Sequence, residues 1–154
     1  MASIEHNKKL IEKYPWLLPH NRWTDEVDKN YDYSYTELDD MPNGWRVAFG
    51  EEMCEEIQQA LNELGEQANT FRIMQIKEKF GFLHFYTNWY TFKISNIIHK
   101  YEEISKYTCI NCGAPATKIT TGWISPFCDK CAEEYHGNVV DINEFYNDDE
   151  FYEE

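Results

Sequence analysis

The sequence predicts an α+β protein in which amphipathic helices pack on a β-hairpin, followed by a four-cysteine module and an acidic tail. Three patterns carry this prediction. Apolar residues recur at helical spacing over 45–64 and 91–107, β-branched and aromatic residues flank a Phe-Gly turn at 80–81, and two Cys-x-x-Cys pairs lie near the C-terminus. We expect three parts: a helical and hairpin domain over 1–107, the cysteine module over 108–140 and the acidic, aromatic tail over 141–154.

The charge of the chain is strongly acidic and unevenly distributed. Its 154 residues carry a formal net charge of −14 at pH 7. Residues 23–66 hold thirteen acids against two bases and residues 108–154 hold ten against two, whereas residues 71–107 hold six bases against three acids. Because an acidic surface repels phosphates, this balance argues against non-specific binding to nucleic acid and leaves 71–107 as the one segment suited to an anion.

Two absences indicate where the protein works. No apolar run approaches the length that crosses a bilayer, and the N-terminus lacks the basic and apolar pattern of a secretory signal. Cysteines paired at metal-binding spacing are typical of a reducing compartment. We therefore expect a cytoplasmic protein with no membrane partner.

The N-terminal half predicts two helices joined by irregular chain. Residues 2–14 form the first, with Ser3 as N-cap and Pro15 at its end. Residues 24–40 alternate acids with tyrosines without a regular period, which favours an exposed loop and, as an alternative, a binding surface. A longer amphipathic helix follows over 45–64; Cys54 lies beside its apolar stripe, and we interpret this thiol as a packing group and not a nucleophile.

A hairpin and a third helix complete the larger domain. Residues 71–79 and 82–87 predict antiparallel strands joined at 80–81. A lone hairpin is marginal in water, so we expect it to pack on the helix that precedes it. Residues 91–107 predict another amphipathic helix, whose apolar stripe consists of Ile94, Ile97, Ile98, Tyr101 and Ile104.

The cysteine module contains the sharpest motif of the chain. Cys109 and Cys112 form one Cys-x-x-Cys pair, Cys128 and Cys131 form the second, and 15 residues separate the pairs. This is the spacing of a four-thiolate zinc site, and Gly113 permits the positive φ that the turn needs. Four thiolates fill a tetrahedron and leave no position for water or substrate, so we expect a structural Zn²⁺.

Around these cysteines the module resembles a known family of zinc fingers. Residues 116–127 predict a small hairpin about Gly122, and a helix begins at the second pair; a turn, a hairpin and a helix in this order form a treble clef. CINCGA at 109–114 with CDKC at 128–131 and the following Tyr135 and His136 resembles the GATA-type fingers, which implies zinc bound by the four cysteines. That family reads DNA with basic residues. This module offers Lys118 and Lys130 and an acidic tail, so we do not expect DNA as its partner.

A second resemblance concerns the rest of the chain. The stretches YSYTELDDMP at 33–42, QIKEKFG at 75–81 and GWISP at 122–126 resemble a group of uncharacterised small proteins of bacteriophages and prophages. The resemblance implies a phage-encoded protein that works in the cytoplasm of the host cell. It brings no established activity with it.

No catalytic constellation is visible in the sequence. There is no glycine-rich phosphate loop, Gly-x-Ser-x-Gly elbow or His-Glu-x-x-His motif, and the five histidines are not spaced as a metal set. The carboxylates fall mostly on faces expected to be solvated, so no acid and base pair can be singled out. We therefore expect no catalytic residues and no enzyme activity.

Four functions remain, in order of preference. The first is a non-catalytic zinc-binding accessory or anti-defence factor that binds a host protein, because acidic surfaces compete with nucleic acid for basic grooves. The second is binding or sequestering of a nucleotide signal, with cations for phosphate and rings for the base. The residues expected to do so are Arg72, Lys77, Lys79, Tyr86, Trp89 and Lys93. Nucleic-acid binding through the finger and zinc catalysis rank last, the latter because the ligand set is closed.

Overall fold

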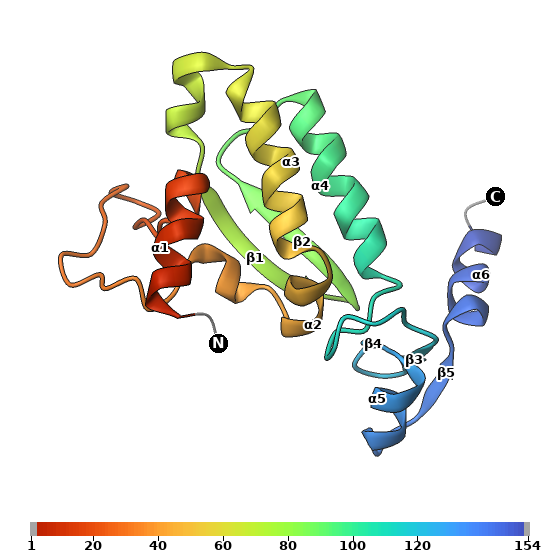
Figure 1. Cartoon of the computed structure of the whole chain (residues 1–154). Coiled ribbons are helices and arrows are strands. Elements are labelled where there is room, and N and C mark those ends of the chain that lie inside the picture. The colour runs from red at the N-terminus through yellow and green to blue at the C-terminus, as the bar shows by residue number, and fades with distance from the viewer. Residues whose placement is uncertain (1–2, 153–154) are drawn as a thin grey trace.

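The computed structural model describes residues 3–152, with the side chains of residues 3–147. Figure 1 shows two groups of elements that follow each other along the chain. The first group consists of α1 (Ile4–Lys13), α2 (Asn43–Trp45), α3 (Glu51–Asn62), the strands β1 (Ile73–Lys79) and β2 (Phe82–Thr87), and α4 (Phe92–Ser105). The second consists of β3 (Lys118–Thr120), β4 (Pro126–Phe127), α5 (Asp129–Glu134), β5 (Val139–Asp141) and α6 (Ile142–Tyr152). The predicted mixed α+β class is confirmed.

The first helix begins and ends where local chemistry predicts. Ser3 is the N-cap of α1, and its hydroxyl accepts a hydrogen bond from the His6 N–H (3.1 Å). Pro15 begins a short 3₁₀ turn, η1 (Pro15–Leu17), that buries Trp16 and Leu17. The Trp16 indole N–H donates to the Gln58 side chain of α3 at 2.8 Å. The N-terminal segment is thereby fixed against the next helix.

The second predicted helix is one helical stretch with a wider turn inside it. It runs from α2 through a π-helical turn, η3 (Arg46–Gly50), into α3. Its buried stripe is Trp45, Phe49, Met53, Ile57, Ala60 and Leu61, as the spacing predicts. Cys54 is also buried, and burial raises the pKa of its thiol well above the usual value, which suits packing and not nucleophilic attack.

The hairpin and α4 close the larger core. β1 and β2 pair antiparallel with Lys79 opposite Phe82 and Ile76 opposite Phe85. Phe80 and Gly81 have φ values of 57° and 85°, the left-handed pair of a tight hairpin turn. The inner side chains of the hairpin, among them Leu83 and Phe85, are buried, and α4 packs on β2 through Ile94, Ile98 and Tyr101. Both predicted strands and the predicted helix are therefore present.

Two segments for which the sequence predicts no helix or strand contain regular structure. Residues 37–40 form a 3₁₀ turn, η2 (Glu37–Asp40), capped by Thr36, and Leu38 is fully buried in the larger core. The acidic tail contains regular structure in the part that the structure describes: β5 pairs with β3, and α6 follows it. Ile142 is buried, and Phe145 and Tyr146 pack on the same small cluster at helical spacing. Residues 153–154 of the predicted tail lie outside the described residues.

The two groups meet where the first cysteine pair lies against α2. The Gly44 N–H donates to the Ile110 carbonyl (2.9 Å), and the Trp45 indole N–H donates to the Thr108 carbonyl (2.9 Å). A Cβ at Gly44 would lie 2.2 Å from the Cys109 carbonyl oxygen, so only glycine permits this approach. Part of the cysteine site is thus held by the first group of elements.

Candidate metal centre

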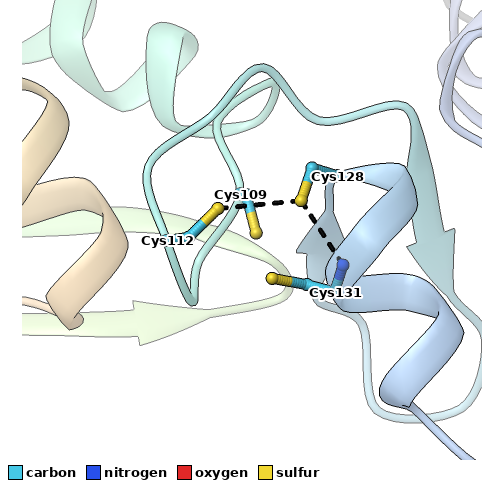
Figure 2. Close-up of side chains that lie close together, drawn as sticks. All are labelled: Cys109, Cys112, Cys128 and Cys131. Carbon is cyan, nitrogen blue, oxygen red and sulfur yellow. Dashed lines mark hydrogen bonds between the residues drawn. The ribbon is translucent and has the colours of Figure 1, made fainter.

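The four predicted cysteines come together in one cluster. Figure 2 shows their side chains converging from a turn on one side and from α5 on the other. All four sulfur atoms lie within 4.8 Å of one another, and the Cys112 and Cys128 sulfurs are 3.6 Å apart. Tetrahedral zinc with Zn–S bonds of about 2.3 Å requires sulfurs about 3.8 Å apart. The arrangement therefore fits one zinc ion bound by four thiolates.

The first pair is carried by a tight turn at residues 109–113, which we call the knuckle. The Gly113 N–H donates to the Cys109 carbonyl (3.0 Å), and the Cys109 N–H donates to the Ala114 carbonyl (2.7 Å). Gly113 has φ of 88°, and a Cβ there would lie 2.7 Å from the Gly44 carbonyl oxygen. Glycine is required at this position for both reasons.

The second pair is carried by the start of α5. Cys128 is the N-cap of this helix, and its sulfur accepts a hydrogen bond from the Cys131 N–H (3.4 Å). The Cys131 sulfur accepts another from the Asn111 side-chain amide (3.4 Å), which crosses from the knuckle. N–H groups directed at sulfur favour the thiolate, the form that binds metal. Asn111 was not among the predicted site residues, although its place between the first two cysteines was the signal.

The charge state of the thiols indicates what the cluster requires. Burial alone raises the pKa of Cys109, but the backbone N–H groups of Cys128, Cys112 and Asn111 outweigh it and lower that pKa to about 7. At Cys131 the Asn111 amide lowers the pKa, whereas burial and the neighbouring sulfurs raise it to about 12. Four thiolates this close repel one another, so the cluster can be fully ionised only around a cation.

The access to the cluster is uneven. Cys109 and Cys131 are buried, Cys128 is half-buried and Cys112 is exposed. A metal ion would thus be covered by the protein on one side and approached from the Cys112 side. A Zn²⁺ ion held here by four protein ligands would supply folding energy and join the knuckle to α5, with no ligand position left for a substrate.

The six residues predicted to bind a nucleotide fall into two places. Arg72 forms an ion pair with Asp25 (2.9 Å), and the Trp89 indole N–H donates to the Thr70 hydroxyl (2.9 Å). These residues lie at one end of the hairpin, and Lys93 pairs with Glu63 (2.9 Å) beside it on α4. The other three lie further along the hairpin: Lys77 and Lys79 on β1 and Tyr86 on β2.

A cavity of about 360 Å³ opens beside Arg72. Its lining includes polar side chains of the N-terminal loop and of the chain that follows β2, among them His20, Arg22 and Asn88. None of the other five predicted nucleotide-binding residues lines it. Of the six residues of the nucleotide hypothesis, this cavity therefore contains Arg72 alone, and its guanidinium is already paired with Asp25.

Comparisons with known proteins found no relative of this chain. No protein-family model, no curated protein and no solved structure matches it. Within residues 3–152, none of the helices has both the length and the apolar character needed to cross a membrane. The cysteine cluster is therefore the feature from which function has to be argued.

Proposed function

We propose that this chain is a non-catalytic zinc protein that acts by binding another macromolecule. The observation that supports the proposal is the closed donor set: four cysteine sulfurs within 4.8 Å of one another, from two segments that the metal would join. Catalytic zinc sites keep one position for water or substrate and take three ligands from the protein. Zinc catalysis, the last of the four functions considered, would require one of these cysteines to leave the metal.

The proposal includes a treble-clef arrangement of the zinc module. Support for it comes from the order of the parts: the knuckle with Cys109 and Cys112, the β3–β4 hairpin, and α5 with Cys128 and Cys131 at its start. β5 and α6 extend this arrangement by adding a third strand and a helix. The resemblance to GATA-type fingers points to the same arrangement.

The partner that the acidic surface favours is a protein with a basic surface. Potentials of opposite sign speed encounter and select partners, whereas a chain of net charge −14 disfavours phosphate-rich partners over most of its surface. The resemblance to small phage proteins would make this partner a host protein, and an anti-defence role would follow from competition for a nucleic-acid groove.

Metal analysis and cobalt substitution test the zinc site. Protein purified under reducing conditions should contain one zinc per chain, and replacement by Co²⁺ should give the visible spectrum of tetrahedral cobalt bound by four thiolates. The Cys109→Ala variant should lose the metal, while Cys54→Ala, which changes the fifth cysteine, should retain it. A cobalt spectrum with an exchangeable water ligand would contradict the closed site and return zinc catalysis to consideration.

A further inference from the structure

The cations of the basic segment 71–107 are of two kinds. Four of them form ion pairs with carboxylates at 2.9 Å or less: Arg72 with Asp25, Lys93 with Glu63, Lys100 with Glu56 and Lys106 with Glu103. Lys77 and Lys79 have no carboxylate partner within 4.0 Å among the residues that the structure describes. These two lysines are therefore the cations of the segment that the fold itself leaves unpaired.

Both lysines lie on the face of the hairpin that is turned away from the core. Ile76, Leu83 and Phe85 point inward and are buried, so the alternate residues point outward. We call this side, made up of Gln75, Lys77 and Lys79 on β1 and Phe82, His84 and Tyr86 on β2, the outer hairpin face. Lys77 stands opposite His84, and Lys79 stands opposite Phe82. A row of positive charge thus runs beside a row of rings.

The rings form a continuous row in which neighbouring rings are tilted against each other. The centroids of Phe82 and His84 are 4.4 Å apart, and those of His84 and Tyr86 are 6.2 Å apart. Tyr86 ends the row with 46% of its surface exposed, and the Lys77 ammonium lies 5.8 Å from its ring centroid. At the other end, the Lys106 ammonium lies 5.0 Å from the Phe82 ring. The Tyr86 end therefore offers a ring and a cation together.

The chemistry of this face selects an anionic partner that also contains flat rings. The outer hairpin face has no carboxylate in a chain with twice as many acids as bases, 28 against 14. Proteins that bind single strands combine cations along the backbone with aromatic rings on which bases stack. A duplex fits this face less well, because its bases are already stacked on each other and are not free to stack on Tyr86. An acidic polypeptide also fits less well, because its carboxylates supply negative charge but no aromatic rings.

We propose that the outer hairpin face binds single-stranded nucleic acid, with a base stacked on Tyr86 and phosphates at Lys77 and Lys79. The proposal goes beyond the zinc site and does not depend on its role. Two phosphate contacts predict weak binding, with a slope of log K against log salt of about −1.4. The acidic remainder of the chain would confine the strand to this face.

Fluorescence anisotropy of the zinc-loaded full chain with labelled dT12 and rU12, at low salt, tests the proposal. We expect Lys77→Glu/Lys79→Glu to abolish binding, while Lys9→Glu/Lys29→Glu, the same charge change at exposed positions of the N-terminal region, retains it. Tyr86→Ala should weaken binding at least about fivefold, the lower limit for loss of one stacked base, and Tyr86→Phe should restore it. Circular dichroism would verify that each variant is folded.

Four results would overturn the proposal. No binding of either oligonucleotide at low salt would do so, and so would equal losses in the two double-lysine variants, since net charge alone would then explain them. Displacement of dT12 by poly-glutamate as effectively as by unlabelled dT12 would identify an acidic polypeptide as the partner. Loss of binding on Lys118→Glu/Lys130→Glu, with none on Lys77→Glu/Lys79→Glu, would assign the strand to the zinc module.

Discussion

The two groups of elements differ most in how each is held together. In the larger group, twenty-one of the described residues form one buried apolar cluster. In the smaller group the cluster contains three, Ala116, Ile119 and Ile142, with Ile124, Phe145 and Tyr146 packed around them. So few buried side chains do not offset the cost of ordering the chain around them, and small modules of this kind depend on a metal or a disulfide. In the smaller group, the four cysteines with a bound metal would take the stabilising role that the apolar core has in the larger group.

The comparison also shows that the smaller group is not independent. The knuckle lies on α2 through Gly44, Gly113 and Trp45, so two of the four cysteines are positioned by the larger group. The other two are positioned by α5 and the small sheet. The metal would therefore join the knuckle, which the larger group already holds in place, to α5, which belongs to the smaller group alone.

Removal of zinc should have the largest effect and should act unequally on the two groups. Structural zinc sites contribute roughly 10–16 kcal/mol of binding free energy near neutral pH. We expect a strong chelator under reducing conditions to unfold β3, β4, α5, β5 and α6 while α1, α3, α4 and the hairpin persist. Amide hydrogen exchange with and without chelator measures this. Loss of protection in both groups together would show that the larger core also depends on the metal.

Truncation of one buried side chain in each group should separate the two kinds of stabilisation. Leu61→Ala in the larger core should cost about 2–5 kcal/mol of unfolding free energy and leave zinc affinity unchanged. Ile119→Ala in the small cluster should appear mainly as weaker zinc binding, because folding of the module is coupled to the metal. Urea unfolding and competition with a chromophoric chelator provide the two measurements. If Leu61→Ala weakens zinc as much as Ile119→Ala does, the distinction fails.

Gly44→Ala should disturb the junction and leave both cores intact. The new methyl group would meet the backbone of Cys109 and Ile110 at 2.2 and 2.6 Å, and backbone cannot move aside as a side-chain end can. We expect a loss of about 1–3 kcal/mol, the usual cost of overpacking. Gly50→Ala is the matched control, since its methyl group would meet only side chains, the nearest being that of Arg46 at 3.3 Å. Equal unfolding curves for the two variants would contradict the proposed role of the junction.

The parts of the structure that could be predicted are those specified by local sequence. The hairpin turn at Phe80 and Gly81, the stripe from Trp45 to Leu61 and the Cys-x-x-Cys pairs each lie within a few residues, and each structure follows from backbone geometry. The cysteine cluster could be predicted because metal binding imposes a residue type and a spacing. It needs no knowledge of the rest of the fold.

The parts that could not be predicted depend on contacts distant in sequence. Among the many acids of residues 141–154, Ile142, Phe145 and Tyr146 recur at helical spacing. These side chains are packed only because β5 pairs with β3, which places α6 against the cluster that contains Ile119. The pairing of Arg72 with Asp25, 47 residues away, likewise places one predicted phosphate ligand in an ion pair that the local sequence does not indicate. Charge counts along the chain indicated how many cations a segment has but not which are already neutralised.

The smallest predicted effect concerns pH and again contrasts the two regions. Glu37 lies at the edge of the larger core, and its burial, reinforced by the negative charge of Asp40 and opposed by Arg22, raises its pKa from 4.5 to about 7. The folded carboxyl thus holds its proton more tightly than the unfolded one. Its contribution to stability is therefore present at low pH and is lost as the pH rises from about 4.5 through 7.

Glu37→Gln removes this titration and makes the contrast measurable. The unfolding free energy of the variant relative to the parent should increase between pH 4.5 and 7, by on the order of 1 kcal/mol because the half-exposed side chain is partly solvated. Zinc affinity should change in the opposite sense, weakening as the pH falls, because thiols must lose protons to bind the metal. Urea unfolding and zinc competition across this range give both curves. A free-energy difference between variant and parent that does not vary with pH would show that folding leaves the pKa of Glu37 unchanged, and that the carboxyl at the edge of the larger core is solvated.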